Sequence, residues 1–559
     1  MPEKADRNLK RQMESCTERL PVQRPVSRAG IRVEILDTTL RDGAQMRGIS
    51  FSVDDKLKIA HCLDDIGIDL IEAGNPGSNP KDMEFFEKTS TQDFNHSKLV
   101  AFGSTRRAGI SAVDDINLAS LCKSCASVVS LVGKCWDYHV REVLSTTNAE
   151  NLVMIYDSVY FLTSKGIRVI FDAEHFFDGY NADPGYAVDC LEAACLAGAS
   201  TLCLCDTNGG AFPSRISAFT SAIAARFSSR VDIGIHCHND GGMAVANTIC
   251  AYEAGARHIQ VSLNGYGERC GNADLCAVIP NLQLKMGCEC LKPEKLSKLT
   301  AVSRQAGEIA NIPHNESAPY VGGNAFSHKA GMHIDGVGKN SSSFEHVNPL
   351  LVGNERRFLL SEVSGRSFIL RMLRQIAPET EKDSPITRKV INRLKELELE
   401  GYQYEGAEAS FELEINKLLN LYKPHFTLVE YKVIVGEPSV GVAGASALIK
   451  IRVGGQEEIT AAEGDGPVEA LDRAIRKAME RFYPRLKMMK LTDYKVRVID
   501  STAATAARVR VLIESAHGSQ TWTTIGVDCD IIHASWKALA DSIEYLLMKE
   551  PYDSIGTDR

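Results

Sequence analysis

Between residues 31 and 300, the chain alternates short apolar runs with longer amphipathic stretches. Each run is continuously hydrophobic, which is typical of a strand buried on both faces. Between the first two runs, residues 53–66 place their apolar side chains on one helical face, and Gly67 follows as a stop signal. The eight apolar runs span residues 32–37, 68–74, 98–104, 127–133, 167–174, 200–206, 231–237 and 257–263.

Strand followed by helix, repeated eight times over about 270 residues, predicts a (β/α)8 TIM barrel across residues 31–299. A doubly wound open sheet is the alternative. That fold favours a glycine-rich dinucleotide-binding turn after the first strand, and the chain has none there. The barrel is therefore the expected fold of the α/β region.

The remaining third of the chain has a different pattern. Residues 300–425 predict helical linker subdomains, rich in charge on their exposed faces. From residue 426 to 559 there is an internal repeat, in which "YKVIV" beginning at Tyr431 recurs as "YKVRV" beginning at Tyr494. Two strand–strand–helix units in tandem predict a C-terminal α+β domain with pseudo-twofold symmetry, suited to dimerisation or regulation.

Composition narrows the class of protein. The 559 residues are 44% apolar and 24% charged, as in ordinary globular proteins, and the net charge of −9 predicts neither a nucleic-acid nor a membrane partner. No run approaches the roughly 18 apolar residues of a membrane span. Residues 1–30 lack the apolar core of a signal peptide and predict a disordered tail. Sixteen scattered cysteines suit reduced thiols and a cytoplasmic location.

Polar and ionisable residues follow every predicted strand, at the end where barrel enzymes place their active sites. His236 and His238 are two residues apart on strand seven, so both side chains face the barrel mouth. Barrel closure brings strand eight between strands seven and one, so Asp42 and Asn272 can complete the cluster. Such ligands suit a catalytic divalent ion. Arg41 would then face the oxygen that becomes negative beside the metal.

Two of these motifs also have ordinary structural explanations. Taken alone, the Arg-Asp-Gly sequence at 41–43 is more typical of a surface turn with a solvated ion pair than of a functional site. The glycine-rich segment "GYGERCGN" at 265–272 fits either a phosphate-binding loop or a tight turn into a helix.

Several motifs together resemble one known family. "DTTLRDGAQ", "AFGSTRR", "DAEHFFDGY", "LCDTNGG", "HCHND" and "NGYGERCGN" resemble the DRE-TIM metallolyases, in the isopropylmalate, homocitrate and citramalate synthase branch. The longer-chain citramalate synthases are the most similar. The resemblance covers residues 31 to about 550. It implies a Claisen-type condensation of acetyl-CoA with a 2-oxo acid, which for citramalate synthases is pyruvate, followed by thioester hydrolysis in isoleucine biosynthesis.

The resemblance also assigns roles to individual residues. It implies a divalent ion, Mg²⁺ or Mn²⁺ with Zn²⁺ as an alternative, and a general base supplied to the partner subunit. A tyrosine common in that segment is replaced here by Phe344, which puts the phenol's role in doubt. The implied catalytic residues are Arg41, Glu174 and His333, the substrate-binding residues are Gln45 and Thr207, and the metal ligands are Asp42, His236, His238 and Asn272.

For the C-terminal domain, the resemblance implies a homodimer inhibited by an end-product amino acid, isoleucine or leucine. Gly464–Gly466 and Gly526 are candidate ligand contacts. Three alternatives remain: the same chemistry on 2-oxoisovalerate or 2-oxoglutarate, an aldol-type lyase, and an amino-acid sensor built on an inactive barrel. The sensor predicts a degraded set of polar residues at the strand ends, whereas the full set is present.

Overall fold

A computed structural model describes residues 30–549, apart from 329–330, 359–372, 374–383, 405, 437–443, 500–506 and 518–519. The expected disordered tail, 1–29, lies outside this range. The chain divides into two compact units, one of Met1–Phe326 with Val347–Glu355 and one of Ser327–His346 with Arg356–Arg559. The domain boundaries expected at 299 and 425 stay predictions.

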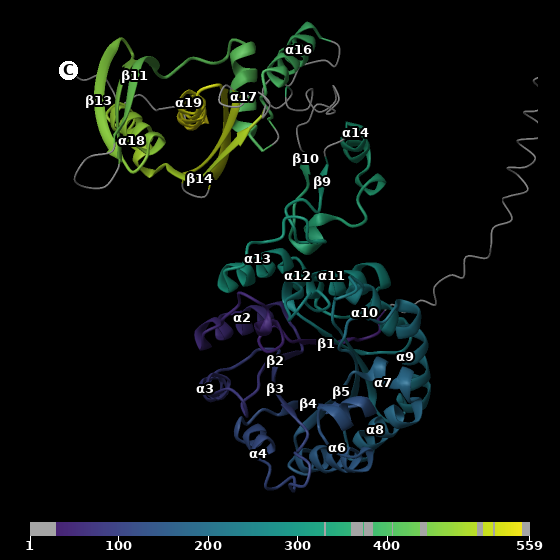
Figure 1. Ribbon diagram of the computed structural model, residues 1–559. Helices are drawn as coiled ribbons and strands as arrows, with labels where there is room; N and C mark the ends of the chain where they lie inside the picture. The colour runs from purple at the N-terminus through teal and green to yellow at the C-terminus, as the bar shows by residue number, and fades with distance from the viewer. Residues whose placement is uncertain are drawn as a thin grey trace, which may run out of the picture. The chain divides into compact units, whose positions relative to one another are not determined.

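The first unit is built on a closed barrel of eight parallel strands in sequence order, each paired with the next and β1 paired with β8. Figure 1 shows the strands around the barrel axis with the helices outside them. The predicted TIM barrel is confirmed, and each strand falls within one residue of its apolar run, or two at some ends. The strands are β1 Glu34–Asp37, β2 Leu70–Gly74, β3 Lys98–Ser104, β4 Val128–Lys134, β5 Arg168–Glu174, β6 Thr201–Asp206, β7 Asp232–Cys237 and β8 His258–Val261.

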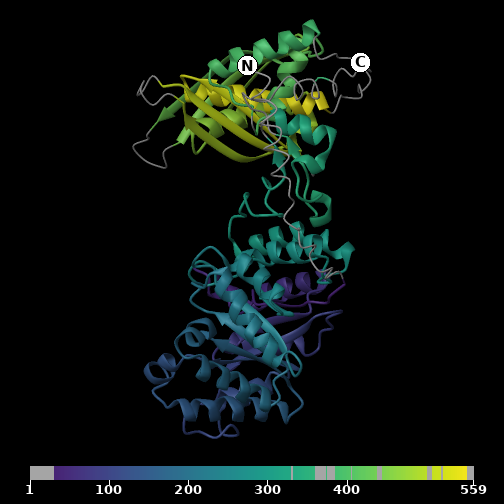
Figure 2. The same cartoon turned by 90° about the vertical axis from the view of Figure 1, so that its right-hand side faces the viewer.

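Helices cover the outside of the barrel (Figure 2). The first of them, α2, has the predicted bounds, since a capping box between Ser52 and Asp55 starts it and Gly67, in the left-handed conformation, ends it. The helices are α2 Val53–Ile66, α3 Pro80–Thr89, α4 Ile116–Lys123, α5 Asp137–Glu142, α6 Asn148–Thr163, α7 Phe176–Ala182, α8 Pro184–Leu196, α9 Pro213–Phe227, α10 Ala244–Glu253, α11 Leu275–Pro280, α12 Pro293–Leu296 and α13 Leu299–Ala310.

Part of the barrel interior is packed with apolar side chains, whereas many polar side chains line the barrel mouth. A small apolar cluster fills the interior below the strand ends, and Cys203 and Cys205 belong to this cluster as buried small side chains. This filling leaves the functional side chains at the carboxyl ends of the strands. The cluster consists of Leu36, Leu70, Val100, Val128, Ile170, Cys203 and Cys205.

The second unit begins with a segment that is mainly helical, as expected, in α14 Gly331–Lys339, α16 Pro385–Leu399 and α17 Glu408–Leu418. It also contains a small parallel sheet that the sequence did not predict, in which β9 Ser327–His328 pairs with β10 Arg357–Phe358. Two-residue strands are too short to produce a recognisable period along the chain.

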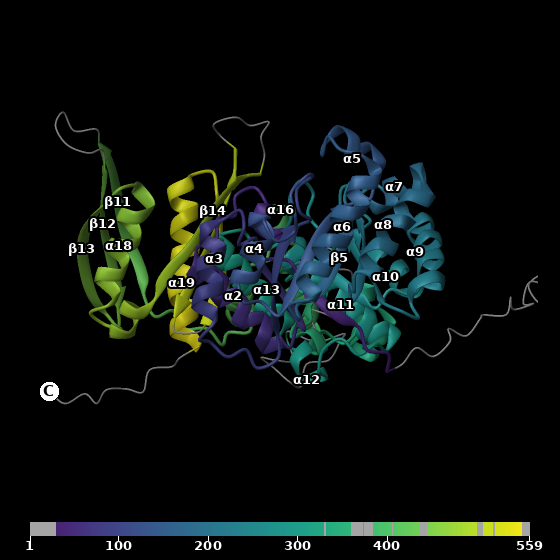
Figure 3. The ribbon, with the colours of Figure 1, turned by 90° about the horizontal axis from the view of Figure 1, so that it is seen from below.

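The C-terminal part repeats one unit twice, and each unit has three antiparallel strands with a helix against them. Figure 3 shows α18 lying against its sheet. The predicted strand–strand–helix repeat was incomplete, because it missed β13 and β16. β13 reads "QEEITAAEG" and is a largely exposed edge strand with little apolar signal. The repeats are β11 Thr427–Gly436, β12 Gly444–Val453, β13, Gln456–Gly464, with α18 Pro467–Met479, and β14 Lys490–Val498, β15 Val509–His517, β16, Gln520–Asp528, with α19 Ile531–Lys549.

Two glycines of this repeat allow a strand to touch its helix. A Cβ at Gly464 would lie 2.6 Å from the backbone nitrogen of Ala470, and one at Gly526 would lie 1.9 Å from the carbonyl oxygen of Ala534. Both distances are shorter than real Cβ contacts allow. Close packing therefore accounts for these two glycines without any bound ligand.

Candidate active site

The turn after β1 positions Arg41 and Asp42. The Thr38 carbonyl accepts hydrogen bonds from the N–H groups of both residues, at 3.1 and 2.9 Å. The Asp37 carboxylate holds this turn by accepting from the N–H and hydroxyl of Thr39 at 3.0 and 2.9 Å. The Thr39 hydroxyl in turn accepts from the Leu263 N–H at 2.8 Å. The turn is thereby tied to the end of β8, which brings Asp42 towards the β7–β8 side of the barrel.

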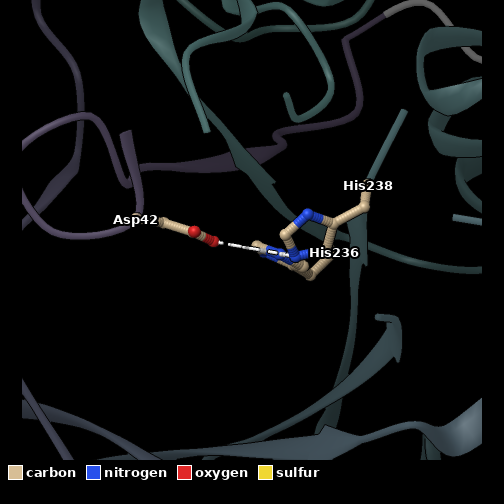
Figure 4. A group of neighbouring side chains, drawn as sticks. All are labelled: Asp42, His236 and His238. Carbon is tan, nitrogen blue, oxygen red and sulfur yellow. Dashed lines mark hydrogen bonds and ion pairs between the residues drawn. The ribbon is translucent and has the colours of Figure 1, made fainter. Parts of the chain in front are cut away.

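Asp42, His236 and His238 converge on one point at the barrel mouth (Figure 4). Oδ2 of Asp42 lies 3.4 Å from Nε2 of His236 and 3.9 Å from Nε2 of His238. The two Nε2 atoms are 3.2 Å apart. All three side chains are buried. A carboxylate oxygen and two imidazole nitrogens facing one another at these distances form a ready set of ligands for a divalent cation.

Asn272 lies beside this cluster. Its Nδ2 donates to Oδ2 of Asp42 at 3.1 Å, and its buried Oδ1 has no hydrogen-bond partner among the described residues. An orphaned amide oxygen is a further ligand for a hard or borderline cation. The four residues predicted as metal ligands therefore come together, and their donor atoms fit a divalent ion.

The electrostatics of the cluster also suit a cation. Burial alone would raise the pKa of Asp42, but Arg41, the two imidazoles and the hydrogen bond from Asn272 outweigh burial and bring that pKa down to about 2. Burial lowers the pKa of His236, and burial together with His236 lowers the pKa of His238 to about 4. The site thus offers an ionised carboxylate and two neutral imidazoles, the protonation states that bind metals.

The glycine-rich segment after β8 forms a tight turn. The Asn272 N–H donates to the Gly265 carbonyl at 3.0 Å, and a Cβ at Gly267 would lie 2.6 Å from Oδ1 of Asn272. Of the two explanations open at the sequence level, the close turn is the one that these contacts support. Its effect is to place Asn272 against Asp42.

Arg41 is held by two residues that were not predicted. Its Nε donates to Oε2 of Glu72 at 2.6 Å, and its guanidinium carbon lies 3.9 Å from the centre of the Phe102 ring. Burial acts to lower the pKa of Arg41, but the charges of Glu72 and Asp42 raise it above its ordinary value. A carboxylate inside the apolar run 68–74 was the one sequence signal for Glu72.

Glu174 and Thr207 follow neighbouring strands. Glu174 ends β5 and forms an ion pair with Lys134 at the end of β4, a residue not predicted for the site. The hydroxyl oxygen of Thr207 accepts from the His175 N–H at 2.9 Å, which leaves its own proton free to point into the cavity. His175 is in the left-handed conformation, with φ of 56°, a strained backbone typical of functional sites.

A cavity of about 770 Å³ opens at this end of the barrel. Of the nine predicted site residues, Asn272 contacts Asp42, and His333 lies on α14 in the second unit. There, His333 is exposed, and its ring stacks on that of Phe344 with centroids 4.2 Å apart. The other seven line the cavity: Arg41, Asp42, Gln45, Glu174, Thr207, His236 and His238.

Family models match three consecutive parts of the chain. The HMGL-like model matches residues 32–305, which contain the barrel and the metal-ligand cluster. The homocitrate synthase post-HMGL domain-like model matches residues 320–401, and the LeuA allosteric (dimerisation) domain matches 405–547. The fold and the site together define a barrel enzyme of the HMGL-like class that depends on a divalent metal ion.

Curated relatives narrow this class. An (R)-citramalate synthase of Aquifex aeolicus is 49% identical over 94% of this chain and 99% of its own length. One from Synechocystis is 46% identical, over 91% and 95%. A probable 2-isopropylmalate synthase of Methanosarcina mazei is 30% identical, over 93% and 96%. The chain belongs to the (R)-citramalate synthase family, as its motifs predicted. None of its described helices is long and apolar enough to cross a membrane.

Proposed function

We propose that this chain condenses acetyl-CoA with pyruvate and hydrolyses the thioester, releasing citramalate and CoA, as a step of isoleucine biosynthesis. The observation that carries this proposal is the 49% identity to an (R)-citramalate synthase over 94% of the chain, against 30% to a probable 2-isopropylmalate synthase. A cytoplasmic location is part of the proposal, and it agrees with the free thiols of the described cysteines.

Pyruvate would bind between Thr207 and the Asp–His–His cluster. The free hydroxyl proton of Thr207 donates to the substrate carboxylate, and Gln45 lines the same cavity. Asp42, His236, His238 and Asn272 would hold the divalent ion, which would supply Lewis acidity to the 2-oxo group. Arg41 stabilises the negative charge that develops on the keto oxygen as the new carbon–carbon bond forms.

The second substrate loses a methyl proton before it attacks. We assign the removal of this proton to His333 of the partner subunit, acting as general base. Glu174, from the barrel that binds the substrates, assists beside the acetyl group. The resulting carbanion attacks the keto carbon, and the keto oxygen takes up a proton. Water then cleaves the thioester and releases CoA. The exposure of His333 and the position of Glu174 in the lining of the cavity support these roles.

Mg²⁺ or Mn²⁺ is the proposed ion, with Zn²⁺ as the alternative. The protein donors are mixed, since two imidazoles suit zinc or manganese, whereas the carboxylate and amide oxygens suit magnesium or manganese. The carboxylate and keto oxygens of a 2-oxo acid add two hard donors, which favours the first pair of ions.

The second unit is proposed to dimerise and to bind isoleucine, or leucine, as an inhibitor. The match to a LeuA allosteric (dimerisation) domain supports this role. A cavity of about 580 Å³ in this unit combines charges of both signs with apolar side chains, as a zwitterion with a hydrocarbon side chain requires. It is lined by Val468, Glu469, Asp472, Arg476, Met489, Lys490, Leu491 and Tyr494.

The test is the release of free CoA, followed with a thiol reagent. The chain is given acetyl-CoA and a divalent ion with pyruvate, 2-oxoisovalerate or 2-oxoglutarate in separate reactions. We expect release with pyruvate and its loss on chelation. Release with only a bulkier or dicarboxylic acid would replace the substrate and keep the mechanism. No release with any of the three would overturn the synthase and favour a lyase or a sensor.

A further inference from the structure

A chain of buried hydrogen bonds runs from His236 across the barrel interior. Nδ1 of His236 lies 2.9 Å from Oε1 of Gln260, and Nε2 of Gln260 donates to Oδ1 of Asp172 at 2.8 Å. The Ser130 hydroxyl donates to Oδ2 of Asp172 at 2.6 Å. These side chains come from β7, β8, β5 and β4, so the chain spans strands that are not neighbours in the sheet. In the described part of the chain, none of the last three residues forms a hydrogen bond or ion pair with Oδ2 of Asp42 or with Nε2 of His236 or His238.

Asp172 lies beyond Gln260 in this chain of hydrogen bonds from His236, and its position as acceptor fixes the direction of the hydrogen bonds that follow. The Ser130 hydroxyl and the amide N–H of Gln260 both donate to Asp172, whose two carboxyl oxygens are the acceptors. The amide oxygen of Gln260 therefore faces His236. Because that oxygen can only accept, Nδ1 of His236 must carry the proton. The unprotonated Nε2 of His236 is then the atom that faces Asp42, and it would be available to hold a divalent ion.

We propose that Gln260, held by Asp172 and Ser130, is a positioning residue that keeps His236 in the tautomer able to bind the metal. The inference rests on the proposed metal site and adds three residues to which the motifs assigned no role. Hydrogen bonds of this kind also fix the ring orientation of a ligating histidine and raise its basicity.

The second histidine provides a comparison within the same site. Nδ1 of His238 is buried and has no hydrogen-bond partner in the described part of the chain. No hydrogen bond to Nδ1 therefore fixes the tautomer of His238. With His236 protonated at Nδ1, the 3.2 Å contact between the two Nε2 atoms is a bond donated by His238. To hold an ion through both Nε2 atoms, only His238 would have to move its proton from Nε2 to Nδ1.

Three variants distinguish this positioning role from a purely structural role of Gln260 in packing. Gln260→Leu removes both the acceptor for His236 and the donor to Asp172. Gln260→Glu keeps an acceptor for His236, since the introduced carboxylate shares a proton with Asp172. His258→Leu is the matched control, because His258 lies two residues away on β8 and bonds Glu34 at 2.8 Å rather than the metal cluster.

The measurement is the affinity of the full chain for Co²⁺, by competition with a chelating dye and by the visible spectrum of the bound ion, without substrates. We expect Gln260→Leu to weaken binding about 10- to 100-fold. Gln260→Glu should restore most of the affinity, and His258→Leu should stay within about twofold of the parent. Circular dichroism of each variant verifies folding.

Two results would overturn the proposal. One is a Gln260→Leu chain that binds Co²⁺ as tightly as the parent, and the other is a Gln260→Glu chain as weak as Gln260→Leu. An Asp42→Ala chain separates this failure from a wrong metal site. If Asp42→Ala abolishes binding while Gln260→Leu does not, the positioning role alone is wrong. If Asp42→Ala leaves binding unchanged, the metal site is wrong and the positioning role with it.

Discussion

Nε of Arg41 donates to Oε2 of Glu72 at 2.6 Å while its guanidinium lies 3.9 Å above the Phe102 ring. Asp42, the next residue, turns to the imidazoles of β7 instead. These two adjacent residues of opposite charge therefore have different further partners, Arg41 on β2 and β3 and Asp42 on β7. The guanidinium is fixed beside the metal-ligand cluster, with its Nη1 3.6 Å from Asp42.

This arrangement predicts that Arg41→Lys lowers kcat about 100- to 1000-fold, since an ammonium cannot both stack on Phe102 and bond Glu72 as a planar guanidinium does. Glu72→Gln keeps the shape of the partner, and we expect a smaller loss of about tenfold. Steady-state CoA release measures both variants. An Arg41→Lys chain with more than a tenth of the parent kcat would contradict the role.

Removal of the ion should abolish CoA release, and added Mg²⁺, Mn²⁺ or Zn²⁺ should restore it to differing extents. Asp42→Asn removes the one carboxylate of the cluster, so we expect its affinity for the ion to fall at least about 10- to 100-fold. Asp240→Asn is a suitable control, because Asp240 is paired with Arg269 rather than with the cluster. Activity that persists in a metal-free preparation would refute the assigned chemistry.

Thr207 should act on the 2-oxo acid alone. Thr207→Val removes the hydroxyl that donates to the substrate carboxylate, and the loss of one such bond to a charged group costs about 1.5–3 kcal/mol, or at least tenfold in KM. Thr207→Ser keeps the hydroxyl and should remain near the parent. The KM for acetyl-CoA should be unchanged in both, and an equal rise for both substrates would point to a general distortion instead.

The close approach of strand and helix in the C-terminal repeat predicts a large loss of stability from one methyl group. Gly526→Ala places a Cβ 1.9 Å from the Ala534 carbonyl oxygen, so we expect the second unit to lose about 1–3 kcal/mol or more on thermal unfolding. Gly466→Ala is the matched control, since no atom lies within 4 Å of its Cβ position. Equal unfolding temperatures for the two variants would be the contrary outcome.

The amino-terminal end of the barrel predicts a pH-dependent stability. Glu34 binds Arg168 through two bonds of 2.7 Å and His258 at 2.8 Å. Burial acts to raise the pKa of Glu34, but His258 and Arg168 outweigh it and hold that pKa well below its ordinary value. A carboxyl group with a lowered pKa in the folded state stabilises the protein above its unfolded pKa, and this contribution is lost as the pH falls.

Glu34→Gln should therefore lower the unfolding free energy by about 1–3 kcal/mol at pH 7, with a difference that shrinks below about pH 4. Denaturant unfolding across this pH range measures the effect. Glu192→Gln, which breaks an exposed pair with Arg230, should cost less than about 1 kcal/mol at any pH. A constant deficit for Glu34→Gln down to pH 2 would show that charge is not the cause.

The local pattern of the sequence was enough to predict much of the fold and part of the candidate site. The eight strands, the bounds of α2 and the shared face of His236 and His238 follow from period, caps and stop signals within a few residues. Barrel closure, inferred from the repeat of strand and helix, was enough to bring Asp42 and Asn272 to these histidines. Each of these features depends either on residues close together in the chain or on the closure of the barrel. Both can be inferred from the sequence.

Tertiary structure decided the rest. Glu72, Phe102 and Lys134 join the site through contacts between strands. The segments of Phe102 and Lys134 do not distinguish them from core or surface residues, and the carboxylate of Glu72 inside an apolar run does not show which residue it binds. Gln260 reaches Asp172 across the barrel interior, a contact set by strand tilt and side-chain rotamers. The exposed edge strand β13 lacks an apolar period altogether. Contacts between residues far apart in the chain leave no local pattern, so only the folded coordinates reveal them.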